Sequence, residues 1–212
     1  MAWFLAPKTE PAAAPVTQDI PIFPINALLF PEGRLGLKIF EQRYLDMASV
    51  SLRDRSPFGI CLIAEGREVG APAVPHLIGT LADIESWDMP QLGILMVSLR
   101  GGRRFRIRQQ RVEANGLVRA AVELFAEAAK TPIPDAWRGL VDLLRQIAHD
   151  AGAERIPPPH RFDDAEWVGH RLTEVLPVKL LAKQKLLELE DPLARLEILH
   201  TFLAQRGLVR KG

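Results

Sequence analysis

The stretch that decides the fold is residues 20–52, IPIFPINALLFPEGRLGLKIFEQRYLDMASVSL. Two prolines near its start restrict the backbone and push the residues before them toward extended conformations, so we expect the stretch to begin as a strand. A turn is expected at residues 31–33, and the alternation of apolar with polar or glycine residues over 34–39 predicts a second, half-buried strand. From Phe40 onward the apolar residues recur at helical spacing, which predicts a short helix.

The segments that follow also have the pattern of strands. Residues 58–64 form a continuous apolar run, which is typical of a strand covered on both faces. Further strands are expected at residues 77–84, 92–100, 105–112 and 117–125. Residues 87–90 are expected to form a turn with two large apolar side chains at its tip, and Gly101 and Gly102 are expected to form a tight hairpin.

The character of the sequence changes at residues 131–134, TPIP, which are expected to form a linker. Three helical patterns follow. The first begins at residue 134 or 135 and ends at Gly152, the second begins with Asp163 as its cap and ends before Pro177, and the last begins at Asp191 and ends at Gly207. Residues 178–189 add a further turn or two of helix. Strands first and helices second predict an α+β chain with two lobes.

The composition is that of an ordinary globular protein, with 212 residues, 48% hydrophobic residues, 25% charged residues and a formal net charge of +1. This balance gives no global field that would draw the chain to nucleic acid or to an anionic membrane. The single cysteine, Cys61, excludes an internal disulfide, and its place in an apolar run is typical of a buried residue rather than a nucleophile. No apolar run approaches the ~20 residues that span a bilayer, and residues 1–5 are too short for a signal-peptide core, so a soluble cytoplasmic protein is expected.

Several motifs carry a resemblance to a known family. The run PIFPINALLFP, which is followed by LKIFEQRYLDM, is similar to the opening of the N-terminal substrate-binding domain of Lon proteases. Four later motifs match this family in the same order: FGICLI at 58–63, IGTLADI at 78–84, GRRFRI at 102–107 and KQKLLE at 183–188. Together the motifs span residues 20–203, nearly the whole chain. One departure is Gln42, which stands where a proline is common in the family.

The resemblance implies both a fold and a function. The expected fold class is α+β, with an N-terminal β-barrel-like (PUA-like) lobe followed by a C-terminal helical bundle. We therefore expect a flexible tail at residues 1–19, a β-rich lobe at 20–130 and a helical lobe at 131–212, which together form one Lon-type domain. The implied function is the recognition of unfolded or exposed polypeptide segments, or of a protein partner.

The sequence lacks the catalytic modules that accompany this domain in Lon proteases. The phosphate-cradling pattern GxxxxGK[ST] is absent, and the chain ends before an ATPase or a Ser-Lys protease module could begin. The five histidines are scattered, and none has a metal-ligand partner at helical spacing. Asp163, Asp164 and Glu166 stand at the start of a predicted helix, where carboxylates are typically capping groups rather than an acid/base pair. No enzymatic activity, cofactor or metal is therefore expected.

Five residues are candidates for contact with a captured polypeptide: Phe40, Arg43, Tyr44, Trp87 and Met89. Methionine and aromatic side chains suit adaptable apolar contacts, and large apolar residues at a turn favour Trp87 and Met89. Phe40 and Tyr44 also lie on the apolar stripe of the predicted helix, so a core role competes for them. Arg43 either binds peptide carbonyls or a carboxylate in a groove, or pairs with Glu41 to hold the helix on the barrel. Capture is expected to be shallow, mostly apolar and located between the two lobes.

An alternative function depends on a basic strand at residues 103–111. Arg104, Arg106 and Arg108 are expected on one face of this strand, with Phe105 and Ile107 on the other. With Arg100, Arg103 and Arg111 they form a basic run of the kind that nucleic-acid proteins use on phosphates, and the barrel of the resembled family is also similar to RNA-binding barrel folds. No aromatic side chains interleave on the basic face, and acidic residues elsewhere offset its charge, so a solvated face with salt-bridge partners competes with this reading. The sequence therefore favours a polypeptide or protein partner over nucleic acid.

Overall fold

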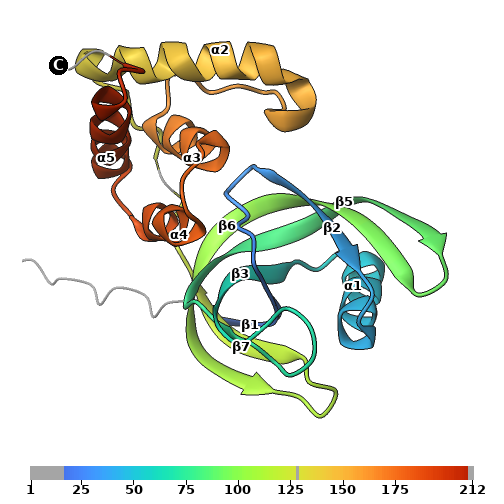
Figure 1. Cartoon of the computed structure of the whole chain (residues 1–212). Coiled ribbons are helices and arrows are strands. Elements are labelled where there is room, and N and C mark those ends of the chain that lie inside the picture. The colour runs from blue at the N-terminus through green and yellow to red at the C-terminus, as the bar shows by residue number, and fades with distance from the viewer. Residues whose placement is uncertain (1–16, 128, 210–212) are drawn as a thin grey trace, which may run out of the picture.

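The computed structural model describes residues 17–127 and 129–209, which fold into a β-rich lobe followed by a helical lobe (Figure 1). The β-rich lobe consists of β1 (Thr17–Ile25), β2 (Arg34–Ile39), α1 (Gln42–Asp54), β3 (Phe58–Glu65), β4 (Val74–Pro75), β5 (Ile78–Gln91), β6 (Ile94–Val112) and β7 (Val118–Leu124). The helical lobe consists of the short 3-10 helix η1 (Asp135–Trp137), α2 (Arg138–Arg155), α3 (Ala165–Val175), α4 (Leu180–Glu188) and α5 (Pro192–Gln205). The predicted α+β class, with strands first and helices second, is confirmed.

The strands of the described residues form one seven-stranded sheet that curls into a near-complete ring. The order along the sheet is β1-β7-β6-β5-β3-β4, and β1 also pairs with β3 in parallel, which joins the two sides of the ring. β2 lies off this path and pairs with the first part of β6, from Leu95 to Arg100. Because the closed path leaves few free edges, this arrangement agrees with the predicted barrel-like lobe.

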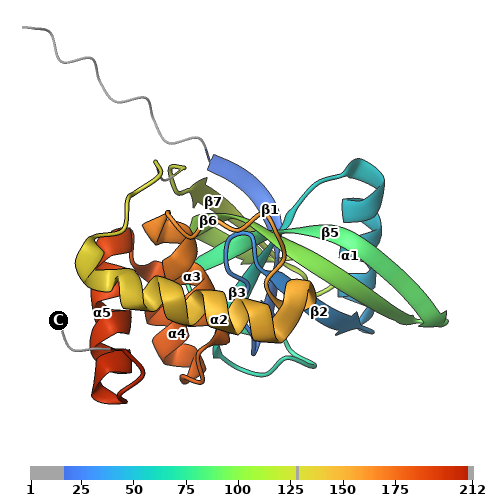
Figure 2. The ribbon, with the colours of Figure 1, turned by 90° about the horizontal axis from the view of Figure 1, so that it is seen from above.

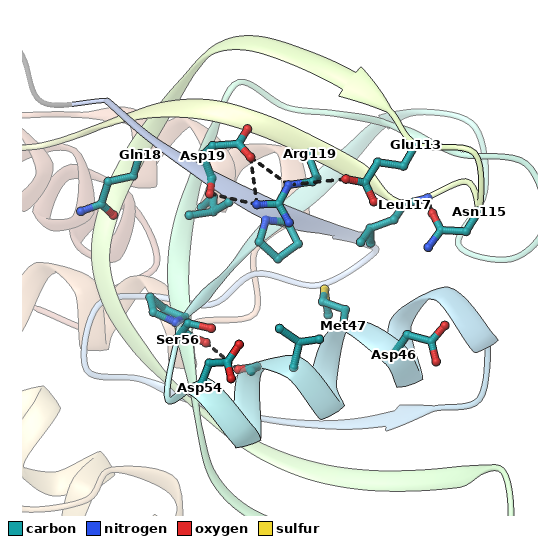
Figure 3. Close-up of a pocket in the computed structure, with 15 residues that line it drawn as sticks. Gln18, Asp19, Asp46, Met47, Asp54, Ser56, Glu113, Asn115, Leu117 and Arg119 are labelled. Atoms are coloured by element: carbon teal, nitrogen blue, oxygen red, sulfur yellow. Dashed lines mark hydrogen bonds and ion pairs between the residues drawn. The ribbon is translucent and has the colours of Figure 1, made fainter.

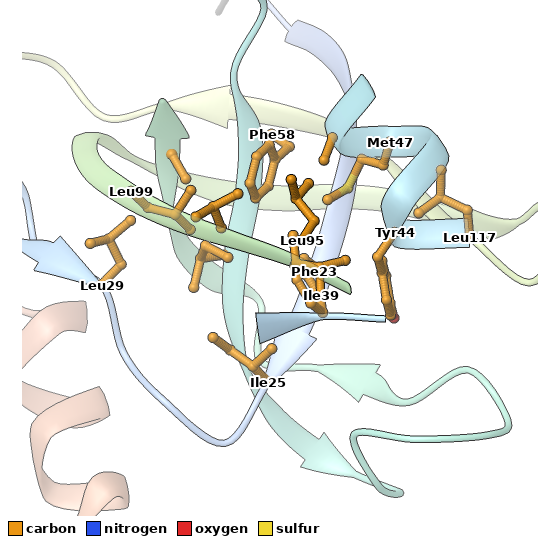
Figure 4. Packing of buried hydrophobic residues seen from close by; sticks show 14 residues of the cluster. Phe23, Ile25, Leu29, Ile39, Tyr44, Met47, Phe58, Leu95, Leu99 and Leu117 are labelled. Atoms are coloured by element: carbon orange, nitrogen blue, oxygen red, sulfur yellow. The ribbon is translucent and has the colours of Figure 1, made fainter. Parts of the chain in front are cut away.

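The ring is filled by apolar side chains from the strands. Phe23 of β1, Phe58 of β3 and Leu99 of β6 are buried, and Tyr44 and Met47 bring α1 against the same cluster (Figure 4). The rings of Phe23 and Tyr44 stack with their centroids 4.0 Å apart. The predicted apolar stripe therefore faces the core of the β-rich lobe at Tyr44, Met47 and Ala48, whereas Phe40 precedes α1 and is exposed.

The tight hairpin predicted at Gly101 and Gly102 is wrong, because β6 runs from Ile94 to Val112 without a break. Gly101 instead allows the turn at residues 30–33 to cross the strand. The Gly101 N–H donates to the carbonyl of Gly33 (2.9 Å), and the Gly101 carbonyl accepts from the N–H of Glu32 (2.7 Å). A Cβ at position 101 would lie 2.9 Å from the carbonyl carbon of Phe30 and would overlap its oxygen, so glycine is required for this close approach.

The turn between β5 and β6 lies at Leu92 and Gly93, and not at residues 87–90 as the sequence pattern predicts. Gly93 has a φ of 80°, in the left-handed region that glycine adopts readily. β5 extends to Gln91 and includes Pro90, because the pairing with β6 is irregular between Asp88 and Gln91. The two strands therefore form one long hairpin whose end projects from the ring (Figure 1, Figure 2).

The N-terminal boundary of the β-rich lobe differs from the prediction. β1 begins at Thr17, inside the segment predicted as a tail at residues 1–19, and its first three residues pair with β7. Residues 1–16 of that predicted tail lie outside the described residues. The sheet therefore includes residues 17–19.

The helical lobe has an apolar core of its own, with Trp167 and Leu172 of α3 packed among side chains of α2 and α5. Figure 2 shows α2 lying across the other helices of this lobe. The cap of α3 is Asp164 rather than the predicted Asp163, since the Asp164 carboxylate accepts from the N–H of Glu166 (3.1 Å). Asp191 caps α5, whose start was correctly placed by the sequence.

Candidate functional site

Five exposed apolar side chains lie toward the projecting end of the β5–β6 hairpin. Phe40, Trp87, Met89, Leu92 and Met96 have exposed fractions between 42% and 92%, and we call these five residues the hairpin surface. The hairpin end points away from α5 (Figure 1, Figure 2). Phe40, Trp87 and Met89 are predicted contact residues. Leu92 and Met96 are additional, and the only sequence signal for Leu92 is the glycine that follows it at the true turn.

The strand register places these residues near one end of the hairpin. β6 lies between β2 and β5 here, and Met96 pairs with Lys38 on β2 and with Asp88 on β5. Phe40 follows the end of β2, and Met89 follows Asp88, so both lie between this row and the tip of the hairpin. Trp87 pairs with the buried Val97, one position along from the Asp88–Met96 pair, so Trp87 and Met96 lie on opposite faces of the sheet. The hairpin surface therefore wraps around the end of the β5–β6 hairpin, which is a more rigid support than a loop.

Arg43 and Tyr44 do not share the exposure of the other predicted contact residues. The Tyr44 ring is buried on Phe23, and burial raises the pKa of its hydroxyl. Arg43 is also buried: it pairs with Glu41 (2.8 Å), donates to the carbonyl of Gly116 (3.2 Å) and lies over the Tyr44 ring at 4.8 Å. These contacts hold the start of α1 on the barrel, which is the structural role that the sequence offered as an alternative for Arg43.

The arginines of the predicted basic strand have partners within the protein. Phe105 and Ile107 are buried, as the alternation predicts. The exposed arginines pair with carboxylates or carbonyls: Arg100 with Glu85 (3.5 Å), Arg103 with the carbonyl of Phe125 (3.1 Å), Arg106 with Glu190 (3.2 Å), Arg108 with Glu123, and Arg111 with Asp19 (2.6 Å). The hydrogen bond from Arg111 lowers the pKa of the Asp19 carboxyl to about 2. Four of these five arginines are therefore ion-paired within the protein.

Arg104 belongs to a buried ionic cluster that joins the two lobes. Its Nη1 donates to the carbonyls of Leu187 (2.7 Å) and Leu189 (2.6 Å) at the C-terminal end of α4, and its Nη2 donates to Glu166 of α3 (3.2 Å). Arg195 of α5 pairs with the second carboxylate oxygen of Glu166 (2.8 Å) and also donates to the carbonyl of Leu189 (2.5 Å). Carbonyls at the end of a helix lack hydrogen-bond donors within the helix, and these two arginines donate to them instead.

His170 of α3 lies beside this cluster, 3.5 Å from Glu166. Burial lowers the pKa of His170 well below its ordinary value, and the charges of Arg195, Arg104 and Arg171 lower it further. Burial also lowers the pKa of Arg104, although the charge of Glu166 opposes this effect. The imidazole is therefore neutral near pH 7, and the cluster connects the lobes without presenting a group for acid/base chemistry to solvent.

The space between the lobes, where the sequence places the capture site, has many charged residues. Two hollows lie there, of about 490 Å³ and about 320 Å³. Arg34, Glu154 and Glu174 contribute to the lining of the first, and Arg103 and Glu127 to that of the second. Because at least half of the lining residues in each hollow are charged, mostly apolar capture fits the hairpin surface better than the space between the lobes.

A further hollow of about 610 Å³ lies within the β-rich lobe, between α1 and β1 (Figure 3). Met47 of α1 and Leu117 contribute apolar walls, and Asp46, Asp54 and Glu113 lie around the rim (Figure 3). Its carboxylates do not converge on one point where a metal could be held. This hollow is open and more mixed in character than the hairpin surface.

The described residues show no constellation for metal or nucleophile chemistry. No group of three His, Cys, Asp or Glu side chains within residues 17–127 and 129–209 could hold a metal ion. Cys61 is fully buried in β3, and burial raises the pKa of its thiol, so the reactive thiolate is disfavoured. Among the described helices, none is long and apolar enough to cross a bilayer.

Comparison with known families identifies the fold. Residues 19–205 match the ATP-dependent protease La (LON) substrate-binding domain. The chain belongs to the Lon substrate-binding domain family. No protease or ATPase domain was found within its 212 residues. The resemblance predicted from the sequence motifs is thus confirmed over nearly the whole chain.

Solved structures of this family have the same architecture. The crystal structure of a Lon N-terminal domain protein from Xanthomonas campestris is 34% identical, with a TM-score of 0.74, and the match covers 87% of this chain and 98% of that one. The N-terminal domain of a Mycobacterium avium complex Lon protease is 18% identical, with a TM-score of 0.64 and coverage of 88% and 98%, and it supports the fold alone. A search of curated proteins gave no match.

Proposed function

We propose that this member of the Lon substrate-binding domain family is a non-enzymatic recognition module that binds unfolded or exposed polypeptide segments. The observation that carries the proposal is the hairpin surface, where aromatic, methionine and leucine side chains are exposed on β5, on β6, in the turn between them and just after β2. Exposed apolar patches of this kind mark interaction sites in soluble proteins. Unfolded segments differ from folded proteins in offering apolar side chains that have no cover of their own.

The chemistry of the hairpin surface suits a partner of variable sequence. Methionine is flexible and polarisable, so Met89 and Met96 can adapt to different apolar side chains. Trp87 offers a large contact area with few rotatable bonds, which is typical of residues that dominate binding energy. The neighbouring Lys38 and Asp88 in the same row can bind backbone or charged groups at the edge. This combination favours broad rather than sequence-specific recognition.

RNA binding through the basic strand remains the alternative class, and the geometry favours it less. Phosphate binding would require Arg106, Arg108 and Arg111 to exchange their present carboxylate partners for phosphates. Arg104 is buried and is committed to carbonyls of α4. An arginine that must first lose an ion pair contributes less to nucleic-acid affinity than one that is free.

Fluorescence anisotropy with labelled casein, an unfolded protein, tests the proposal. Replacing Trp87 and Met89 with alanine should weaken binding about 5- to 30-fold for each true anchor, which corresponds to roughly 1–2 kcal/mol. The matched control replaces Leu77 and Val112 with alanine, because these exposed apolar residues lie far from the hairpin end, just before β5 and at the end of β6. Equal losses in both double variants would contradict the assignment of binding to the hairpin surface.

A labelled RNA separates the two functional classes. Replacing Arg106 and Arg108 with glutamine removes two cations from the basic strand and leaves the buried Arg104 in place. If RNA were the ligand, its affinity and the salt dependence of binding would both fall, with the slope shrinking by about one unit per lost phosphate contact. We expect casein binding to be unchanged in this variant. RNA binding that withstands ~200 mM salt, without casein binding, would assign the function to the basic strand instead.

A further inference from the structure

Helices α4 and α5 carry more apolar surface than the fold covers. On α5, Leu196, Leu199 and Leu203 are buried in the helical core, yet Ile198 on another face is 49% exposed. On α4, Leu181 is 62% exposed. A helix that is apolar on several faces is normally covered on those faces, because each exposed side chain forgoes the gain from burial. Part of the apolar surface of the two helices is thus without cover among the described residues.

Ile198 borders a groove between the two helices, at the edge of the helical core, whereas Leu181 lies outside the groove lining. The groove has a volume of about 830 Å³, larger than any of the hollows described above. Its lining comes from the end of α3 onward: Pro177, Val178, Ala182, Leu186, Leu189, Ile198, Leu199 and Phe202 supply the apolar part. Ile198 and Phe202 are four residues apart and therefore lie on one face of α5. We call this the α4–α5 groove.

The rim of the groove is basic. Lys179, Lys185 and Arg206 lie along it, against one carboxylate, Glu188. Lys185 already pairs with Glu188 (2.8 Å), so the charge that remains comes from Lys179 and Arg206. Within the described part of the chain, neither of these two side chains has a carboxylate partner, and the Arg206 guanidinium lies over the Phe202 ring at 3.6 Å. A ligand with acidic groups at its edges would complete these pairs.

We propose that the α4–α5 groove docks an amphipathic helix of a partner protein, with an apolar stripe that is flanked by Asp or Glu residues. A groove between two helices accepts the ridge of a third helix, whose side chains at i, i+3, i+4 and i+7 fill it. The basic rim selects acidic flanks and disfavours basic ones. Because the groove is on the helical lobe and the hairpin end points away from α5, this second interface is independent of the hairpin surface (Figure 1).

The test uses the full chain and two labelled helical peptides of roughly 18 residues, about 27 Å long as helices. Both peptides have the same leucine stripe, and the flanking residues are glutamate in one and lysine in the other. We expect the glutamate peptide to bind at least tenfold more tightly, with an affinity that falls as salt is added. Equal affinity of the two peptides, or tighter binding of the lysine peptide, would overturn the proposal.

Variants locate the binding site. Ile198→Glu places a charge in the apolar lining, and Lys179→Glu reverses the charge of an exposed rim residue without disturbing a buried contact. Each substitution should lower the affinity for the glutamate peptide at least tenfold. The variant with alanine at Trp87 and Met89 is the matched control and should bind this peptide normally. Loss of peptide binding in that control with retention in both groove variants would place the helix on the hairpin surface and would refute the proposal. A chain that self-associates through Ile198 and does not bind the peptide would assign the groove to a second copy, which also refutes it.

Discussion

Replacing Arg104 with leucine tests whether the buried ionic cluster holds the lobes together. The guanidinium is the point at which β6 contacts both α3 and the end of α4, through three hydrogen bonds to Leu187, Leu189 and Glu166. Leucine retains apolar bulk near this position and removes all three bonds. The free energy of unfolding should therefore fall because of lost polar contacts rather than because of a large cavity.

The size of the loss depends on which acceptors keep a partner. The carbonyl of Leu189 and the carboxylate of Glu166 still accept from Arg195, whereas the carbonyl of Leu187 loses its arginine. Breaking a buried ion pair by removing one partner costs about 3–5 kcal/mol, and hydrogen bonds to charged groups contribute about 1.5–3 kcal/mol each. Since two acceptors of three remain bound, we expect a loss of about 2–4 kcal/mol. For a chain of this length, the melting temperature should fall by about 4–16 °C.

Urea unfolding followed by circular dichroism measures this loss. The matched control is Arg106→Leu, two residues along the same strand, because Arg106 makes a single ion pair with the well-exposed Glu190. Exposed pairs contribute about 0–1 kcal/mol, so the control should remain close to the parent. Equal effects of the two substitutions would refute the reasoning. A more stable Arg104→Leu protein would also refute it, since this would mean that desolvation of the cluster outweighs its hydrogen bonds.

Three further predictions follow from single positions. Gly101→Ala should lower the free energy of unfolding by about 1–3 kcal/mol or more, because the new Cβ would overlap the carbonyl of Phe30. Gly102→Ala places its Cβ at an ordinary 3.4 Å from Leu81 and should lower this free energy much less. The midpoints of urea unfolding compare the two variants. The pKa of His170 is lowered in the folded state, so the unfolded chain binds more protons below about pH 6.5 and the stability of the protein falls on acidification. His170→Gln should reduce this pH dependence. An unchanged profile of unfolding free energy against pH would contradict the prediction. Asp19, with a folded pKa of about 2, contributes stability above pH 3.8 that is lost as the pH falls toward 2, and Asp19→Asn should remove this loss in acid unfolding curves.

The part of the fold that local periodicity encodes could be predicted from the sequence. The alternation in residues 34–39 and the helical spacing after Phe40 correspond to β2 and α1, because side-chain direction in these elements repeats every 2 and every 3.6 residues. Gly101 shows where this reasoning ends. A glycine pair is typical of a turn, but its role here is set by a turn at residues 30–33, far away in the sequence, and no local pattern encodes that neighbour.

The candidate site was predictable to a similar extent. Trp87 and Met89 are exposed, although they lie on a strand near the hairpin end and not in a turn. Tyr44 is on the predicted stripe and is buried, since the stripe faces the core. Arg104 was expected on a solvated face, yet α3 and α4 cover it from positions more than 60 residues away in the sequence. Alternation predicts which side of a strand a residue occupies but not which distant element covers that side.

The course of β6 relates the binding surface to the connection between the lobes. The strand carries Met96 near the hairpin end and Arg104 in the interlobe cluster, eight residues further on, a span of roughly 26 Å. Between them, the backbone N–H and C=O of Gly101 are both hydrogen-bonded to the turn at residues 30–33, through Gly33 and Glu32. A displacement of the hairpin end would therefore be opposed by the hydrogen bonds of Gly101 before it reached the cluster. This arrangement favours a module in which the exposed hairpin end can adapt to a bound segment while the two lobes keep their relative position.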